Sequence, residues 1–155
     1  MNIIRHIFRF LVAVTECYFP ESYYDRSLTG AQADQLILNE IAKQKLPLLM
    51  EHLKLCDVEL PVITLTWFIT LFYNSVPFET MLRIWDCFLL EGPKVLYRFS
   101  LAFLDAFQKT VLNITDNISI INVFKKTLEV TYDADTIVQV RCCRRLYYMN
   151  TLLLL

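Results

Sequence analysis

Residues 60–78 read LPVITLTWFITLFYNSVPF and form the longest run of the chain without a charged side chain. Nineteen residues are enough to span a bilayer as a helix. However, Pro61 and Pro77 stand near the two ends, and the apolar centre covers only residues 62–73. Clusters of Lys and Arg, which flank membrane-spanning helices, are missing here. The stretch therefore predicts a buried helix over 61–74 and no integral membrane segment, with a small multi-helix membrane protein kept as an alternative.

The remainder of the chain has the same helical period. Apolar side chains recur every three to four positions, and an alternation with a period of two never extends over the length of a strand. The predicted helices cover residues 2–17, 31–45, 47–55, 61–74, 77–90, 93–112 and 118–130. Ser27 or Thr29 is expected to cap the second helix and Asp116 the last. The inward face of the second helix is expected to hold Ile37, Leu38 and Ile41. The fold class is therefore all-α, with about seven helices.

Composition excludes several classes of function. The 155 residues carry a net charge of -1, with 55% hydrophobic and 20% charged side chains, which excludes a disordered chain and a basic nucleic-acid-binding surface. Two glycines cannot form a Gly-rich phosphate loop, and two histidines, His6 and His52, leave little room for a histidine-built metal site, so no metal is expected. No cofactor is expected. Five cysteines without a CxxC spacing, and no secretory signal, favour a reduced intracellular compartment.

A series of motifs carries a family resemblance. In order they are FPESYY (19–24), ADQ (33–35), KLP (45–47), WFITLF (67–72) and RIWDCFLLEG (83–92). This series resembles the C-terminal half of a TBC-type domain, the all-helical module that activates GTP hydrolysis by Rab small GTPases. The resemblance runs from about residue 7 to about residue 110. It implies a partial TBC domain over 1–112, followed by a helical C-terminal extension over 113–155.

The resemblance also implies a partner and a location. The partner is a Rab-type small GTPase, and the setting is vesicle trafficking in the cytoplasm, with peripheral contact to endomembranes as one option. The activity of the family resides in an arginine finger, in an IPxDxxR motif, and a glutamine finger, in a YxQ motif. Neither motif occurs in this sequence: the residues Asp25 and Arg26 are adjacent, and no glutamine has a tyrosine two positions before it.

We therefore expect a regulatory module that is not an enzyme and lacks activity alone. It would be a fragment, a splice form or an incomplete gene model, and a missing N-terminal lobe would pair with it. That absence is expected to expose apolar surface on the helix over 2–17 and around Trp67. The alternative is a non-catalytic protein that binds a small GTPase or acts as a scaffold.

Individual residues are open to two interpretations each. Asp34 and Gln35 are candidates for partner binding, as a GTPase contact or a support of the finger-bearing lobe, or else Asp34 only complements the helix dipole. Cys142 and Cys143 lie in a basic cluster and are either acylated or part of an inert tail. The residues expected in the structural core, rather than at a partner hot spot, are Trp67, Phe68, Trp85 and Phe88.

Overall fold

The computed structural model describes residues 2–129, and every regular element in this range is helical, as the sequence predicts. The seven α-helices are α1 (Asn2–Ala13), α2 (Thr29–Lys45), α3 (Pro47–Leu55), α4 (Leu60–Ile69), α5 (Phe78–Glu91), α6 (Lys94–Val111) and α7 (Asn117–Glu129). The bounds of α3, α5 and α6 agree with the predicted ranges to within one residue at each end. The predicted roles of Cys142 and Cys143, and the extension beyond residue 129, lie outside the described residues.

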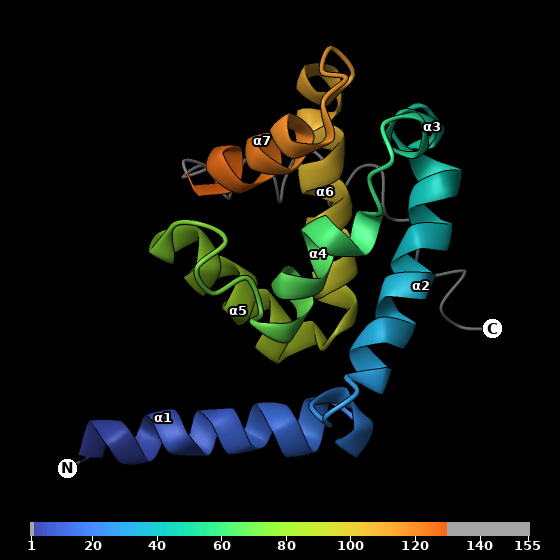
Figure 1. The fold of residues 1–155 in the computed structure, drawn as a ribbon. Helices are drawn as coiled ribbons and strands as arrows, with labels where there is room; N and C mark the ends of the chain where they lie inside the picture. Colours follow the sequence, from blue (N-terminus) through green and yellow to red (C-terminus); the bar gives the residue numbers. More distant parts are fainter. Residues whose placement is uncertain (1, 130–155) are drawn as a thin grey trace.

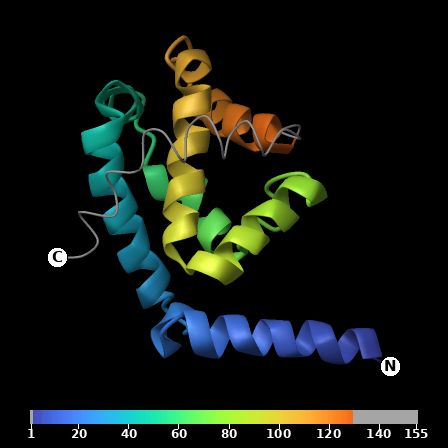
Figure 2. The same cartoon turned by 180° about the vertical axis from the view of Figure 1, so that it is seen from behind.

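Helix α6 is the centre of the body. Helices α4, α5 and α7 pack against it, and α2 packs against α4 (Figures 1 and 2). Its side chains Leu96, Phe103 and Leu104 are fully buried, and its polar residues Lys94 and Lys109 lie near the two ends. A helix this apolar needs neighbours on most sides, which is why a thin polar stripe predicts a central helix.

Helix α1 leads away from the body along one edge (Figure 1). It passes into a π-helical turn, Val14–Tyr18, and stops at Phe19, whose backbone is extended with φ -125° and ψ 151°. Pro20 follows, and a proline forces the residue before it out of the helical region. The connector then makes a short 3₁₀ turn, Glu21–Tyr23, before α2 begins.

The start of α2 differs from the prediction. Neither Ser27 nor Thr29 caps the helix; the Asp25 carboxylate does, because its Oδ1 accepts the Thr29 backbone N–H at 3.2 Å. Leu28 has a left-handed backbone with φ 52°, which turns the chain back toward Asp25. Within α2, Leu38 is fully buried, but Ile37 is 44% exposed, so the predicted inward position of Ile37 is wrong. Gln35, one turn before Leu38, faces inward instead.

Helix α4 is shorter than the predicted 61–74. It ends at Ile69, and the chain then passes through three left-handed residues: Leu71, Phe72 and Asn74, with φ between 51° and 63°. The Phe72 N–H donates to the Trp67 carbonyl at 2.8 Å, and this bond closes the end of the helix. Phe72 is fully buried, so packing of its ring offsets an unfavourable backbone conformation.

The end of the described chain follows the sequence prediction closely. Asp116 caps α7, since its Oδ2 accepts the Ser119 N–H at 2.8 Å. The contact with the Ser119 hydroxyl, together with this bond to the Ser119 N–H, lowers the pKa of Asp116. The cap was readable from sequence because donor and acceptor lie three residues apart.

Candidate functional site

A polar cluster forms where the connector, α2 and α6 meet. Asp34 lies in the first half of α2 and is half-buried, with the hydroxyl groups of Tyr23 and Tyr97 beside its carboxylate. Gly30 allows this approach, because a Cβ at that position would lie 2.9 Å from Tyr23 Cα. The fold thus brings Asp34 of the ADQ segment against Tyr23, 11 positions before it, and Tyr97, 63 positions after it.

The electrostatics of the cluster follow from burial. Burial raises the pKa of Asp34, while contact with the Tyr97 and Tyr23 hydroxyls partly opposes that rise. Burial first, and the nearby Asp34 charge second, raise the pKa of Tyr23. The Tyr23 hydroxyl is buried without a hydrogen-bond partner of good geometry, so its contact with Asp34 is the looser one. Both tyrosines therefore stay protonated at neutral pH and present O–H groups to the carboxylate.

Gln35 lies deeper than Asp34. Its side chain is in the interface between α2 and α4, only 3% exposed, and its Oε1 accepts the Thr64 hydroxyl at 2.6 Å. The Gln35 Nε2 group is buried without a partner. A partner protein therefore has access to Asp34 but not to Gln35 in this structure, and the partner-binding role of this pair stays a prediction.

The four predicted core aromatics lie in two environments. Trp67, Phe68 and Phe88 are at most 3% exposed and belong to the main core. Trp85 is only partly buried, and its indole Nε1 donates to the Leu71 carbonyl at 2.8 Å. The Trp85 ring also stacks on Phe10 of α1, with ring centroids 4.8 Å apart. Trp85 thus connects α1 with the left-handed turn after α4.

An apolar groove of about 900 Å³ lies beside Trp85. One wall is α1 with its π-helical turn, and the other is the turn after α4 together with the first half of α5. The residues that line it are Phe10, Leu11, Val14, Thr15, Tyr24, Ile69, Thr70, Leu71, Tyr73, Phe78, Met81, Leu82 and Trp85. The sequence predicts exposed apolar surface on the first helix and around Trp67. Phe8 of α1 is 65% exposed; the Trp67 ring itself is 3% exposed, while Val62 on the same helix is 57% exposed and Tyr73, in the turn after it, 52%.

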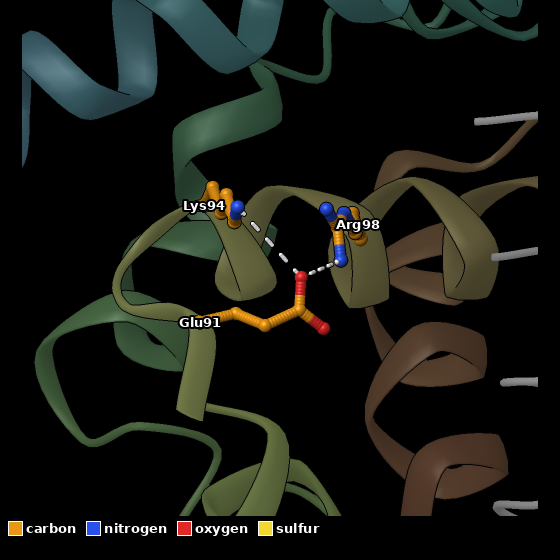
Figure 3. Close-up of polar contacts among 3 residues, drawn as sticks. All are labelled: Glu91, Lys94 and Arg98. Carbon is orange, nitrogen blue, oxygen red and sulfur yellow. Dashed lines mark hydrogen bonds and ion pairs between the residues drawn. The ribbon is translucent and has the colours of Figure 1, made fainter. Parts of the chain in front are cut away.

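The basic residues near the α5–α6 corner are held in the scaffold. Arg98 Nη1 lies 2.5 Å from Glu91 Oε2, and Lys94 Nζ lies 3.8 Å from the same oxygen (Figure 3). The Arg98 side chain is only 18% exposed. Gly92, with φ 83°, makes the sharp turn that brings Glu91 back over α6. An arginine held by a carboxylate in this way stabilises the corner and is not extended toward a partner.

A metal site and a membrane-spanning helix are two further features to consider in the described residues. Among residues 2–129, no group of three or more His, Cys, Asp or Glu side chains is arranged to hold a metal ion. In the same range, no helix is both long and apolar enough to cross a membrane.

Comparison with known proteins supplies the family. Residues 3–112 match the family described as Rab-GTPase-TBC domain. The chain belongs to the TBC domain family. The match covers all helices from α1 to α6, and with them the polar cluster at Asp34 and the apolar groove.

Individual relatives agree with this assignment. The chain is 34% identical over 130 residues to mouse TBC1 domain family member 2B, and 38% identical over 121 residues to human TBC1 domain family member 2A. These alignments cover 84% and 76% of the chain, but only 14% and 13% of the relatives. A solved structure, described as the Chlamydomonas flagellar RabGAP TBC domain, superposes with a TM-score of 0.76 at 28% identity. The chain covers 42% of that structure, so it spans less than half the length of each of these proteins.

Proposed function

We propose that residues 3–112 act as the Rab-facing C-terminal part of a GTPase-activating domain, and that this chain alone does not accelerate GTP hydrolysis. The family match over residues 3–112 supports the first statement. The absence of an IPxDxxR and a YxQ motif from the 155 residues supports the second. An arginine finger contributes roughly 10³ to 10⁵ in rate, and no apolar core residue replaces it.

The structure supports this proposal through the state of three of the described arginines, Arg98, Arg83 and Arg26. Arg98 is paired with Glu91 and largely covered, and Arg83 is engaged within the chain. Arg26 is exposed but lies directly after Asp25, whose carboxylate caps α2. A finger must reach the phosphoryl group of a bound nucleotide from an extended position.

We assign the partner contact to Asp34. Its carboxylate is half-buried with the Tyr97 and Tyr23 hydroxyls beside it, so its movement is restricted while one edge remains accessible. Gln35 supports Asp34 from behind by joining α2 to α4 through Thr64. A pre-oriented carboxylate loses little conformational freedom on binding, which favours its use as a specific contact.

The test uses single-turnover phosphate release from a panel of GTP-loaded Rabs, with and without the purified chain. The expected result is no stimulation. Stimulation of tenfold or more, abolished by substitution of one of the chain's own arginines, would refute the proposal. In a second step, an N-terminal TBC lobe that carries both fingers is added as a separate polypeptide. If the proposal is right, the two polypeptides together should stimulate phosphate release.

The binding-only alternative predicts a different result in the second step. A scaffold of the same fold binds a Rab but gives no stimulation even with the added lobe. Binding is measured by surface plasmon resonance with Asp34→Ala and with Glu40→Ala as the matched control, since Glu40 is exposed on the same helix. A role for Asp34 requires that only Asp34→Ala weakens binding.

A further inference from the structure

We propose that His52 and Cys56, together with the backbone carbonyl of Ile114, form a binding site for a zinc ion that links the end of α3 to the loop between α6 and α7. This inference goes beyond Rab binding and GTPase activation and rests on neither. It rests on the distances among the three donor atoms, on the way the fold positions them, and on their chemistry.

The three donor atoms converge on one point. His52 Nε2 lies 2.8 Å from the Ile114 carbonyl oxygen and 3.6 Å from Cys56 Sγ, and Cys56 Sγ lies 3.9 Å from the same oxygen. Zinc bonds of about 2.1 Å to nitrogen and about 2.3 Å to sulfur, at the tetrahedral angle, separate the two ligand atoms by about 3.6 Å. The triangle of all three atoms has its centre about 2.0 Å from each of them, so a single ion fits there with bonds of ordinary length.

Local structure places the two side chains on one face of α3. His52 and Cys56 are four residues apart, and the Cys56 N–H donates to the His52 carbonyl at 3.0 Å, so the helical register extends to Cys56. On the same helix, Leu49 and Leu53 are at most 1% exposed and anchor α3 in the core. The imidazole and the thiol therefore project together from an anchored helix.

The third donor comes from a turn that lies 58 residues after Cys56. The Ile114 N–H donates to the Val111 carbonyl at 2.9 Å, and Val111 is fully buried. The Asn113 side chain also donates to a carbonyl at the end of α6, at 2.9 Å. The turn is thus held by its own bonds, with the Ile114 carbonyl directed at His52. A donor this distant, supplied by the backbone, leaves no spacing pattern in the sequence.

The chemistry of the donors selects zinc over magnesium or calcium. Imidazole nitrogen and thiolate are ligands of zinc, whereas magnesium and calcium take oxygen ligands. All three residues are partly exposed, so water completes the fourth position of a tetrahedral ion.

Zinc binding exchanges protons for metal bonds. The Cys56 thiol gives its proton to solvent, and the neutral His52 ring carries its proton on Nδ1 instead of Nε2. The ring must rotate as well, because Nε2 now directs its N–H at the Ile114 carbonyl oxygen. A zinc–oxygen bond then replaces that hydrogen bond, so the contact between α3 and the loop after α6 is kept.

The experiment measures thermal unfolding of the reduced, metal-free 155-residue chain with and without zinc chloride, up to about 100 μM. Zinc should raise the unfolding temperature, because a ligand that binds only the folded chain stabilises it. Cys56→Ser and His52→Gln should each abolish this rise. Both variants are expected to fold, since Ser keeps a hydroxyl and Gln an N–H donor for the Ile114 carbonyl. Magnesium chloride should leave the unfolding temperature unchanged in every variant.

Two controls separate this site from the other cysteines. Cys17→Ser should keep the full zinc effect, because Cys17 is an exposed free cysteine in the π-helical turn after α1. The variant Cys142→Ser with Cys143→Ser should keep it too.

Cobalt(II) locates the ion independently, because a cobalt–thiolate bond gives a charge-transfer absorption. One equivalent of cobalt should give this band in the parent chain and in both controls, but not in Cys56→Ser. An unfolding temperature that zinc does not raise would overturn the proposal. So would a zinc effect that Cys56→Ser or His52→Gln leaves intact, or one that either control abolishes, by placing the metal at other residues.

Discussion

The indole of Trp85 should determine whether the turn after α4 keeps its left-handed conformation. Leu71 and Phe72 both have positive φ, a conformation that costs roughly 1–2 kcal/mol for a residue with a side chain. The Nε1–H of Trp85 holds the Leu71 carbonyl at 2.8 Å. Trp85→Phe keeps an aromatic ring but deletes this donor, so it tests the hydrogen bond separately from the packing.

The magnitude follows from the two contacts of the ring. Losing the hydrogen bond removes about 0.5–1.5 kcal/mol. Trp85→Ala also removes the stack on Phe10, about 0.5–1.5 kcal/mol, and the burial of one side of the ring. We therefore expect a loss of about 1 kcal/mol for Trp85→Phe and about 3 kcal/mol for Trp85→Ala. Trp67→Ala should cost 3–5 kcal/mol, because Trp67 is almost completely buried.

Urea unfolding followed by circular dichroism gives these free energies, and hydrogen exchange locates the effect. In Trp85→Phe, the amide of Phe72 should exchange faster, because its bond to the Trp67 carbonyl depends on the shape of the turn. The amide of Met50, bonded to the Leu46 carbonyl in α3, is the internal control and should not change. A Trp85→Phe variant within about 0.5 kcal/mol of the parent, with unchanged exchange at Phe72, would show that the indole does not hold the turn.

Three further predictions concern single residues. Asn74→Gly should stabilise the chain by up to about 1 kcal/mol, because Asn74 is exposed with φ 60°, whereas Asn122→Gly in α7 should destabilise it by a few tenths; thermal unfolding compares the two. Because the pKa of Asp34 is raised above 3.8 in the folded chain, ionisation of this carboxyl should lower the free energy of unfolding as the pH rises through that pKa. Asp34→Asn cannot ionise and should remove this pH dependence, which urea unfolding from pH 4 to 7 measures. Thr64→Val should cost about 1–3 kcal/mol in the same assay, because it leaves the buried Gln35 Oε1 without its donor.

The helices themselves could be predicted from sequence because their causes are local. The α3 range follows from Pro47 at a first helical turn, and the α7 start follows from Asp116 three residues before the amide that it caps. The end of α4 could not be predicted in this way. Its final shape depends on Trp85, fourteen residues beyond the carbonyl that the indole holds. The cap of α2 was missed because it depends on the left-handed backbone of Leu28.

In the candidate site, too, the sequence indicates the residues, whereas their burial and partners depend on tertiary packing. The ADQ segment identified Asp34 and Gln35, but only the fold shows that one is half-buried and the other enclosed. The partners of Asp34 come from the connector and from α6, at Tyr23 and Tyr97, and no local pattern relates these positions. The apolar groove is similarly distributed over α1, the turn after α4, and α5, so its existence depends on tertiary packing.

The segment FPESYY joins the two surfaces that this fold presents. Tyr23 lies against Asp34, while Tyr24, the next residue, lines the groove and bonds to the Ile69 carbonyl. Phe19 stacks on Tyr23 with ring centroids 3.9 Å apart, and the Tyr23 and Tyr24 rings are 5.1 Å apart. These rings form one packed unit, so the Tyr24 wall of the groove and the Tyr23 neighbour of Asp34 are consecutive residues held by the same aromatic contacts.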